Sequence, residues 1–141
     1  MKLTVLAVGK LKESWLEEGA AEFHKRLRVK LPCEVIEVKD EAGLVKALPP
    51  RSELWVLDEH GAQLTSEELS RAIGERMNRG ESGMAFAIGG ADGHSDEFLK
   101  RARFRWSLGK LTLPHRLARV ILLEQLYRAL AILKGEPYHR P

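Results

Sequence analysis

Short apolar runs that alternate with amphipathic stretches are the feature that most constrains the fold of this chain. The runs have the short length and apolar content of buried strands, and they lie at 3–8 (LTVLAV), 34–38 (EVIEV), 54–58 (LWVLD), 84–88 (MAFAI) and 106–108. Helical spacing and end signals predict helices at 14–27, from about 41 to 48, from 65 to about 78, from about 95, and from Pro114 to Gly135. This alternation predicts an α/β fold in which helices cover both faces of a parallel sheet.

Local signals refine two helix starts and one turn. Ser14 with Glu17, and Thr65 with Glu68, have the spacing of capping boxes. The stretch EHGAQL (59–64) is turn-like, so we expect the third strand to end before it.

The size and composition of the chain predict one domain spanning residues 1–141, of which 44% are hydrophobic. No apolar run approaches the roughly 18 residues of a membrane span, and charge comes too early in MKLTVLAVGKLKESW for a secretory signal, so we expect a cytoplasmic protein. Cys33 is the only cysteine, which excludes an internal disulfide and a cysteine-clustered zinc site. We expect it to be a small buried apolar residue.

The formal net charge of +3 is unevenly distributed. Residues 1–99 carry 13 Lys and Arg against 18 Asp and Glu, whereas residues 100–141 carry 10 against 2. KRARFR (100–105) supplies four of these cations. Such a stretch attracts nucleic-acid phosphates, although it is also typical of a solvated helix face, and charge alone does not separate the two.

Three unusual loops follow strands at the edge of the sheet where ligands of parallel α/β proteins bind: LDEHG (57–61), IGGADG (88–93) and SLGKLTLPH (107–115). Gly89 and Gly90 would let backbone approach a ligand closely, although a tight strand-to-helix turn needs the same residues. The chain lacks a P-loop, a Rossmann fingerprint, a nucleophile elbow and a His-Glu-x-x-His helix, and its five histidines are scattered. We therefore expect no metal, and a nucleotide-like ligand held by backbone remains open.

Longer stretches in a fixed order carry a family resemblance. They are VGK (8–10), LDEHG, AIGGADG (87–93), WSLGKLTLPH (106–115), RVILLEQLYRA (119–129) and KGEPYHR (134–140). By these stretches, the chain resembles the ribosomal RNA large subunit methyltransferase H family of the SPOUT methyltransferases. The resemblance extends over the whole chain. The resemblance implies a deep trefoil knot in the C-terminal part of the sheet, a homodimer, and S-adenosyl-L-methionine (SAM) as cofactor. It also implies a substrate, N3 of a pseudouridine in 23S rRNA, methylated on the assembled ribosome.

The resemblance assigns the loops to the cofactor. It implies that SAM is bordered by Leu57, Gly89 and Gly90, and is wrapped by Leu108, Gly109, Lys110, Leu111, Thr112 and Leu113. The alternative for the leucines is an ordinary place in the core.

The tail GEPYHRP holds the candidate catalytic residues. His139 could take the N3 proton, Tyr138 could stack on or hydrogen-bond the target base, and Arg140 could hold a phosphate. The alternative is a frayed chain end. Asp58 and Glu124 are other carboxylates near these elements, although Glu124 could instead pair with Arg128 one helical turn on.

The last helix is apolar on more than one stripe, which predicts a second partner and hence a two-fold dimer. The alternative is complete burial of the helix within one subunit. The chain has no appended RNA-binding domain, so we expect the basic C-terminal part and the dimer to supply the RNA surface. Two alternatives stay open: a SPOUT enzyme acting on another RNA, and a non-catalytic ribosome- or RNA-binding module of the same fold.

Overall fold

In the computed structural model, which describes residues 1–141, five parallel strands form one sheet. The strands are β1 (Lys2–Val8), β2 (Cys33–Val38), β3 (Ser52–Gln63), β4 (Gly83–Ile88) and β5 (Phe104–Ser107), in the spatial order β2-β1-β4-β3-β5. The helices are α1 (Ser14–Lys30), α2 (Glu41–Ala47), α3 (Ser66–Asn78), α4 (Asp96–Lys100) and α5 (His115–Leu133). The predicted α/β fold with a parallel sheet is confirmed.

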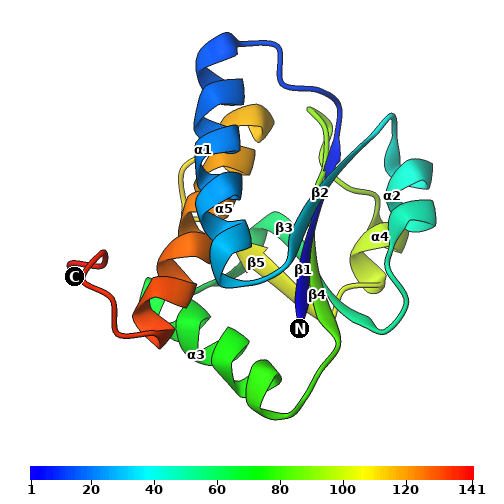
Figure 1. Cartoon of the computed structure of the whole chain (residues 1–141). Helices are drawn as coiled ribbons and strands as arrows, with labels where there is room; N and C mark the ends of the chain where they lie inside the picture. Colours follow the sequence, from blue (N-terminus) through cyan, green and yellow to red (C-terminus); the bar gives the residue numbers. More distant parts are fainter.

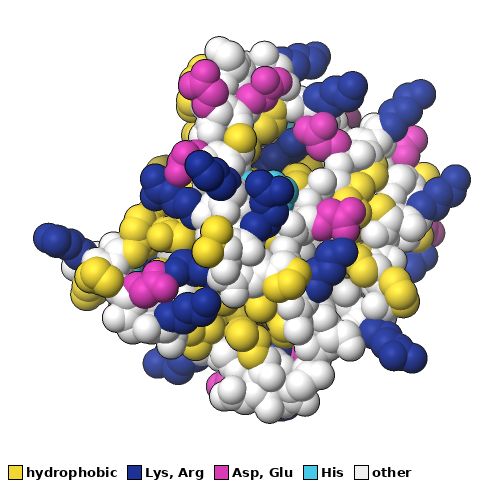
Figure 2. Space-filling model, viewed as in Figure 1, with side chains coloured by type: hydrophobic (Ala, Val, Ile, Leu, Met, Phe, Trp, Pro, Cys, Tyr) yellow, Lys and Arg dark blue, Asp and Glu magenta, His cyan; other side chains and the backbone are white.

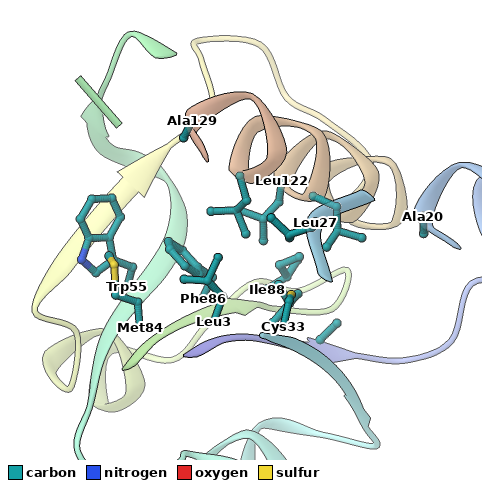
Figure 3. Close-up of a cluster of buried hydrophobic side chains, with 14 of the residues drawn as sticks. Leu3, Ala20, Leu27, Cys33, Trp55, Met84, Phe86, Ile88, Leu122 and Ala129 are labelled. Atoms are coloured by element: carbon teal, nitrogen blue, oxygen red, sulfur yellow. The ribbon is translucent and has the colours of Figure 1, made fainter. Parts of the chain in front are cut away.

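Helices cover both faces of the sheet, also as predicted. Helices α1, α3 and α5 lie on one face and α2 and α4 on the other (Figure 1). The larger core lies under the first three helices and includes Leu27, Phe86 and Leu122, whose side chains converge in Figure 3. A smaller core on the other face includes Leu44 of α2 and Phe98 of α4. Because both faces are buried, β4 is buried at every position, which explains its continuous apolar sequence.

Cys33 lies in the larger core, where 8% of the residue is exposed. Burial raises the pKa of its thiol to about 12, so the thiol stays protonated at neutral pH. The expectation of a small buried apolar residue is confirmed.

The two predicted capping boxes have different outcomes. At α3 the box is complete: the Thr65 hydroxyl accepts from the Glu68 backbone N–H at 3.0 Å, and the Glu68 carboxylate accepts from the Thr65 N–H at 2.8 Å. At α1 the prediction is wrong, because Ser14 is already helical and the N-cap is Glu13, whose side chain makes no capping bond. The spacing was right but began one residue inside the helix.

The turn predicted at 59–64 is wrong, because β3 continues to Gln63. Leu57 and Ala62 both stand opposite Trp106 of β5, so the four residues between them bulge out of the sheet. Gly61 permits this close passage, since a Cβ there would lie 2.5 Å from the Arg105 carbonyl oxygen. The bulge turns Asp58 and Glu59 toward the end of the sheet where the predicted site lies.

The fifth strand runs from Phe104 to Ser107 rather than from 106 to 108. It ends where the Ser107 hydroxyl accepts from the Gly109 N–H and donates to the Gly109 carbonyl, so the chain turns locally instead of pairing further. The last helix follows Pro114 and stops before Gly135, whose φ of 68° ends it, as predicted.

The resemblance also implies a trefoil knot in the C-terminal part. Strand β5 lies at the sheet edge beside β3, and the segment from β5 to α5 passes the ends of β3 and β4, an arrangement compatible with such a knot. The threading itself stays a prediction. None of the five helices combines the length and the hydropathy that a bilayer span needs.

Candidate functional site at the carboxyl ends of β3, β4 and β5

A cavity of about 140 Å³ lies at the carboxyl ends of β3, β4 and β5 and is called the main cavity below. Three chain segments wall it: 57–59 in the bulge of β3, the loop after β4, and the segment from β5 into α5. An adjoining cavity shares the bulge and the loop after β4 and opens toward α4. Both therefore lie where parallel α/β sheets bind ligands.

The structure brings most of the predicted cofactor residues together around the main cavity. Its wall includes Leu57, Gly89, Gly90, Leu108, Gly109, Leu111 and Leu113. Thr112 lines the adjoining cavity instead, and Lys110 lines neither and is exposed. Leu111 is 80% exposed, so it is not an ordinary core residue, which was the alternative for the leucines.

The paired glycines have an identifiable structural task. A Cβ on Gly89 would lie 2.7 Å from the Gly93 carbonyl oxygen, and Gly90 forms an isolated antiparallel bridge with Gly93. The close approach at Gly89 therefore belongs to a tight turn, which was the alternative interpretation. At Gly90 a Cβ would lie 3.3 Å from the Val8 side chain, and the position faces both cavities.

The two cavities are lined by acidic side chains and by no Lys or Arg. Asp58 and Glu59 face both, and Asp92 and Asp96 face the adjoining cavity. None of the four pairs with a Lys or Arg; the Asp58 carboxylate accepts from the His60 N–H at 3.0 Å, and Glu59 lies 3.5 Å from the His60 ring. The charged residues of both cavity walls are consequently all acidic.

His94 is a site residue that the sequence did not single out. It lines both cavities, its side chain is 3% exposed, and neither ring nitrogen has a hydrogen-bond partner. The ring stacks on Phe98 with centroids 5.0 Å apart, and its Nδ1 lies 3.8 Å from the Glu41 carboxylate. Burial lowers the pKa of His94, outweighing the opposite effects of Glu41, of the Ala87 backbone and of Asp58, so the ring is neutral at neutral pH.

The candidate catalytic residues of the tail lie elsewhere on this chain. The Tyr138 hydroxyl donates to the Glu124 carboxylate at 2.7 Å, and His139 Nδ1 lies 3.0 Å from Arg128 Nη1. Arg128 also pairs with Glu124 at 2.9 Å, as the alternative for that carboxylate predicted. This group of five residues, completed by the exposed Arg140, is the tail cluster.

The tail cluster is anchored rather than frayed as far as His139. The Arg128 guanidinium lies 4.7 Å from the centre of the Tyr138 ring, which also packs edge-on against Tyr127 at 4.8 Å. Partial burial, the hydrogen bond to Glu124 and the charge of that carboxylate raise the pKa of Tyr138. No residue of 138–140 lines the main cavity, whose α5 wall is formed by His115 and Ala118 in the first turn of the helix. Within one chain, the tail and the main cavity are therefore separate.

Comparison with known proteins decides the family. The family described as "Predicted SPOUT methyltransferase" matches residues 1–139. Relatives named ribosomal RNA large subunit methyltransferase H include one from Geobacter metallireducens, 44% identical over 99% of each chain. Another, from Carboxydothermus hydrogenoformans, is 42% identical over 99% of this chain and 100% of that protein. This chain belongs to that family of SPOUT methyltransferases.

Solved structures agree with the SPOUT fold of the chain. A protein from Haemophilus influenzae described as a "probable methylase family protein" superposes with a TM-score of 0.61 at 11% identity, covering 99% of this chain and 70% of that one. A protein from Legionella pneumophila described as a "putative methyltransferase", solved with bound SAM, superposes with a TM-score of 0.51 at 14% identity, covering 92% of this chain and 66% of that one. At these identities the likeness concerns the fold alone.

The SPOUT methyltransferase chain holds no group of three or more His, Cys, Asp or Glu side chains arranged to share a metal ion. Arg119 of α5 is a buried cation, 3% exposed, with a structural role. It pairs with Glu37 at the end of β2 and donates to the Gly9 carbonyl at 2.9 Å. This contact fixes the first turns of α5, and with them the wall of the main cavity, against β1 and β2.

Proposed function

We propose that this protein is a SAM-dependent methyltransferase that methylates N3 of a pseudouridine in 23S rRNA on the assembled ribosome. The observation that carries the proposal is the main cavity, because the three segments that wall it are the ones that the family resemblance assigns to SAM. Membership of the family named for ribosomal RNA methylation supports the substrate class. The position methylated and the ribosomal context rest on the resemblance.

The residues of the main cavity fit SAM in their chemistry. Leu57, Leu108 and Leu113 offer apolar contact for an adenine ring, and Gly90 carries no side chain that would intrude. The unpartnered ring nitrogens of His94 provide hydrogen-bonding capacity in the wall, and the carboxylates of Asp58 and Glu59 suit a cation. When bound, SAM supplies a methyl group already activated by its sulfonium.

Catalysis by the chain then consists mainly of positioning. The nucleophilic N3 must lose its proton and stand about 3–3.5 Å from the carbon it attacks. The segment 108–113 and the bulge of β3 would hold the cofactor, while the tail would hold the target base. His139 and Asp58 are the candidates for accepting the N3 proton directly, and otherwise solvent accepts it.

The RNA surface that we propose is a basic segment, defined as the five exposed cations of residues 100–110: Lys100, Arg101, Arg103, Arg105 and Lys110. No side chain of the five forms an ion pair or hydrogen bond within the chain, whereas Arg116 pairs with Glu13 and Arg119 with Glu37. Figure 2 shows Lys and Arg spread over the visible face, so total charge does not single out a surface. What distinguishes the basic segment is that its five cations are close in sequence and have no internal partner, so they remain free for phosphates.

A second copy of the chain completes the proposed site. Trp15 is 64% exposed and Leu111 is 80% exposed, and hydrophobic side chains are visible beside α5 and the tail in Figure 2. A homodimer would cover this apolar surface and let the tail of one chain reach the main cavity of the other. A monomeric mass at micromolar concentration in sedimentation would contradict it.

The test is methyl transfer from SAM labelled in its methyl group. Free 23S rRNA, large subunits and whole ribosomes are compared, together with an rRNA transcript that contains uridine in place of pseudouridine. We expect incorporation into whole ribosomes, with the label on N3 of one pseudouridine by mass spectrometry of nucleosides, and none into the transcript. Label on a different RNA would favour another SPOUT specificity. SAM binding without transfer to any RNA would favour a non-catalytic module.

A further inference from the structure

The residues that line the main cavity include two carboxylates but no lysine or arginine side chain. Asp58 and Glu59 face the cavity, and no Lys or Arg does. The nearest members of the basic segment do not offset them, because Lys110 is exposed outside both cavities. The charged residues that line the main cavity are therefore both acidic.

We propose that the carboxylates of the main cavity bind SAM in preference to its demethylated product, S-adenosylhomocysteine. The inference rests on the proposed function, in which this cavity holds SAM. The two molecules differ by one methyl group and one positive charge. On transfer, the methyl forms its bond to N3, the N3 proton leaves to the base or solvent, and the electron pair of the broken S–CH₃ bond stays on sulfur. The sulfonium becomes a neutral thioether, and the attraction to the carboxylates is lost with its charge.

The histidines of the cavity do not cancel this attraction. Burial lowers the pKa of His94, and burial together with Arg116 and Arg119 lowers the pKa of His115, so both rings are neutral at neutral pH. The groups that face His94 from neighbouring elements are Glu41 of α2 and Asp58 of the bulge, both acidic. The two histidines therefore add no positive charge beside the carboxylates of Asp58 and Glu59 at neutral pH.

The expected preference is about tenfold in affinity, a size that one or two partly exposed charge interactions supply. This preference would assist turnover, because methyl transfer itself would weaken binding of the product and favour its release. A site that recognised only adenine, ribose and the amino-acid end would bind both molecules equally.

The experiment is calorimetric titration of the full-length protein with three probes at pH 7.5. These are SAM, S-adenosylhomocysteine, and sinefungin, which carries an amine cation in place of the sulfonium. We expect SAM and sinefungin to bind about tenfold more tightly than S-adenosylhomocysteine. Added salt should shrink the ratio, since Glu59 is 58% exposed and its charge is screened.

The variant is Asp58→Asn with Glu59→Gln. The Asn side chain keeps an oxygen that can accept from the His60 N–H, so the bulge retains its hydrogen bond. The matched control is Glu18→Gln with Glu75→Gln, which changes net charge equally at exposed positions of α1 and α3 outside both cavities. We expect the first variant to lower the ratio of the two dissociation constants to about twofold and the control to leave it unchanged.

Several results would overturn the inference. Equal affinity of the wild type for SAM and S-adenosylhomocysteine removes charge selection but leaves the cavity as the cofactor site. An equal change of the ratio in variant and control assigns the effect to total charge rather than to Asp58 and Glu59. Absence of binding by any of the three probes to the folded protein rejects the inference and the proposed cofactor together.

Discussion

The main cavity and the basic segment lie next to each other in the chain but carry opposite charge. The cavity presents Asp58 and Glu59 without a Lys or Arg, whereas the segment presents five cations without an internal partner. Strand β5 connects the two, because it carries Arg105 on the exposed sheet edge and delivers Ser107 and Gly109 to the cavity wall. Two ligands of opposite charge can therefore be held a few residues apart.

This difference explains how a small chain can handle a cationic cofactor and a polyanionic substrate together. RNA phosphates are attracted to the basic segment and repelled from the acidic cavity, so the electrostatics orient an RNA strand with its backbone outside. An uncharged base is the part of the RNA that the cavity would admit. A change confined to one region should therefore leave the ligand of the other region bound.

The largest expected effect comes from the tail, which belongs to neither region. If the cavity and the basic segment sufficed for methyl transfer, deletion of residues 138–141 would leave turnover intact. We expect turnover to fall about 100-fold, because loss of base positioning has effects of that order, while SAM affinity stays within about twofold. Single-turnover methylation and calorimetry on the same protein measure the two quantities.

The deletion also removes the hydrogen bond between Tyr138 and Glu124, so the melting temperature should fall slightly. Glu124→Gln is the matched control, since it weakens the same anchor but keeps the tail. Full turnover in the truncated protein would move the search for catalytic groups to Asp58 and the cavity loops.

The next largest effect should come from the basic segment. The triple change Arg101→Ala, Arg103→Ala and Arg105→Ala should weaken ribosome binding about tenfold and lower the slope of log affinity against log salt by about 2. SAM affinity should not change, because these side chains do not line the main cavity. Filter binding over a salt series gives the slope.

A triple change of Lys25, Arg28 and Arg71 to Ala is the control for that experiment. These three are exposed cations on α1 and α3 that form no ion pair, so they match the charge removed. If the control weakens ribosome binding as much as the first variant, RNA attraction is a property of the whole surface and the comparison fails.

The smallest effect concerns the pH dependence of stability through His94. Its folded pKa lies below the ordinary value of 6.5, so as pH falls below about 6.5 the unfolded chain takes up the proton first. Stability from the neutral ring is therefore complete above that pH and declines as pH falls toward the lowered folded value. We expect His94→Gln to reduce the pH dependence of the melting temperature between about pH 5 and 7. His60→Gln, at an 85% exposed side chain, should not.

The order and type of the elements could be predicted from the sequence, because buried parallel strands are continuous apolar runs and helices have their own period. The turn at 59–64 could not, because the bulge depends on pairing with Trp106 and on a backbone passage at Gly61 that no local pattern encodes. The capping box at Ser14 failed for a related reason, since the same spacing fits one residue further into a helix.

The sequence predicted the cavity wall of the site in more detail than the role of the tail. The cavity wall follows from motifs at strand ends, which a parallel sheet brings to one edge, and most of the named residues meet there. His94 was missed because a single histidine carries no spacing signal; only its position in the loop after Gly90 pointed to it. The place where the tail acts, across a dimer in the cofactor site of the partner, stays a prediction, because within one chain the tail packs on α5.

The most direct test of the account is calorimetric titration of SAM into the wild type and into Gly90→Val. Gly90 lies in the wall of both cavities, and a Cβ there would already lie 3.3 Å from the Val8 side chain, so the two further methyl groups of valine would crowd Val8 and displace the loop that walls the cavities. We predict one SAM per cavity for the wild type and a loss of affinity of about 100-fold or more for the variant, with Gly90→Ala between them. Unchanged SAM affinity in a Gly90→Val protein that retains its circular dichroism and cooperative melting would contradict the assignment of the main cavity to the cofactor.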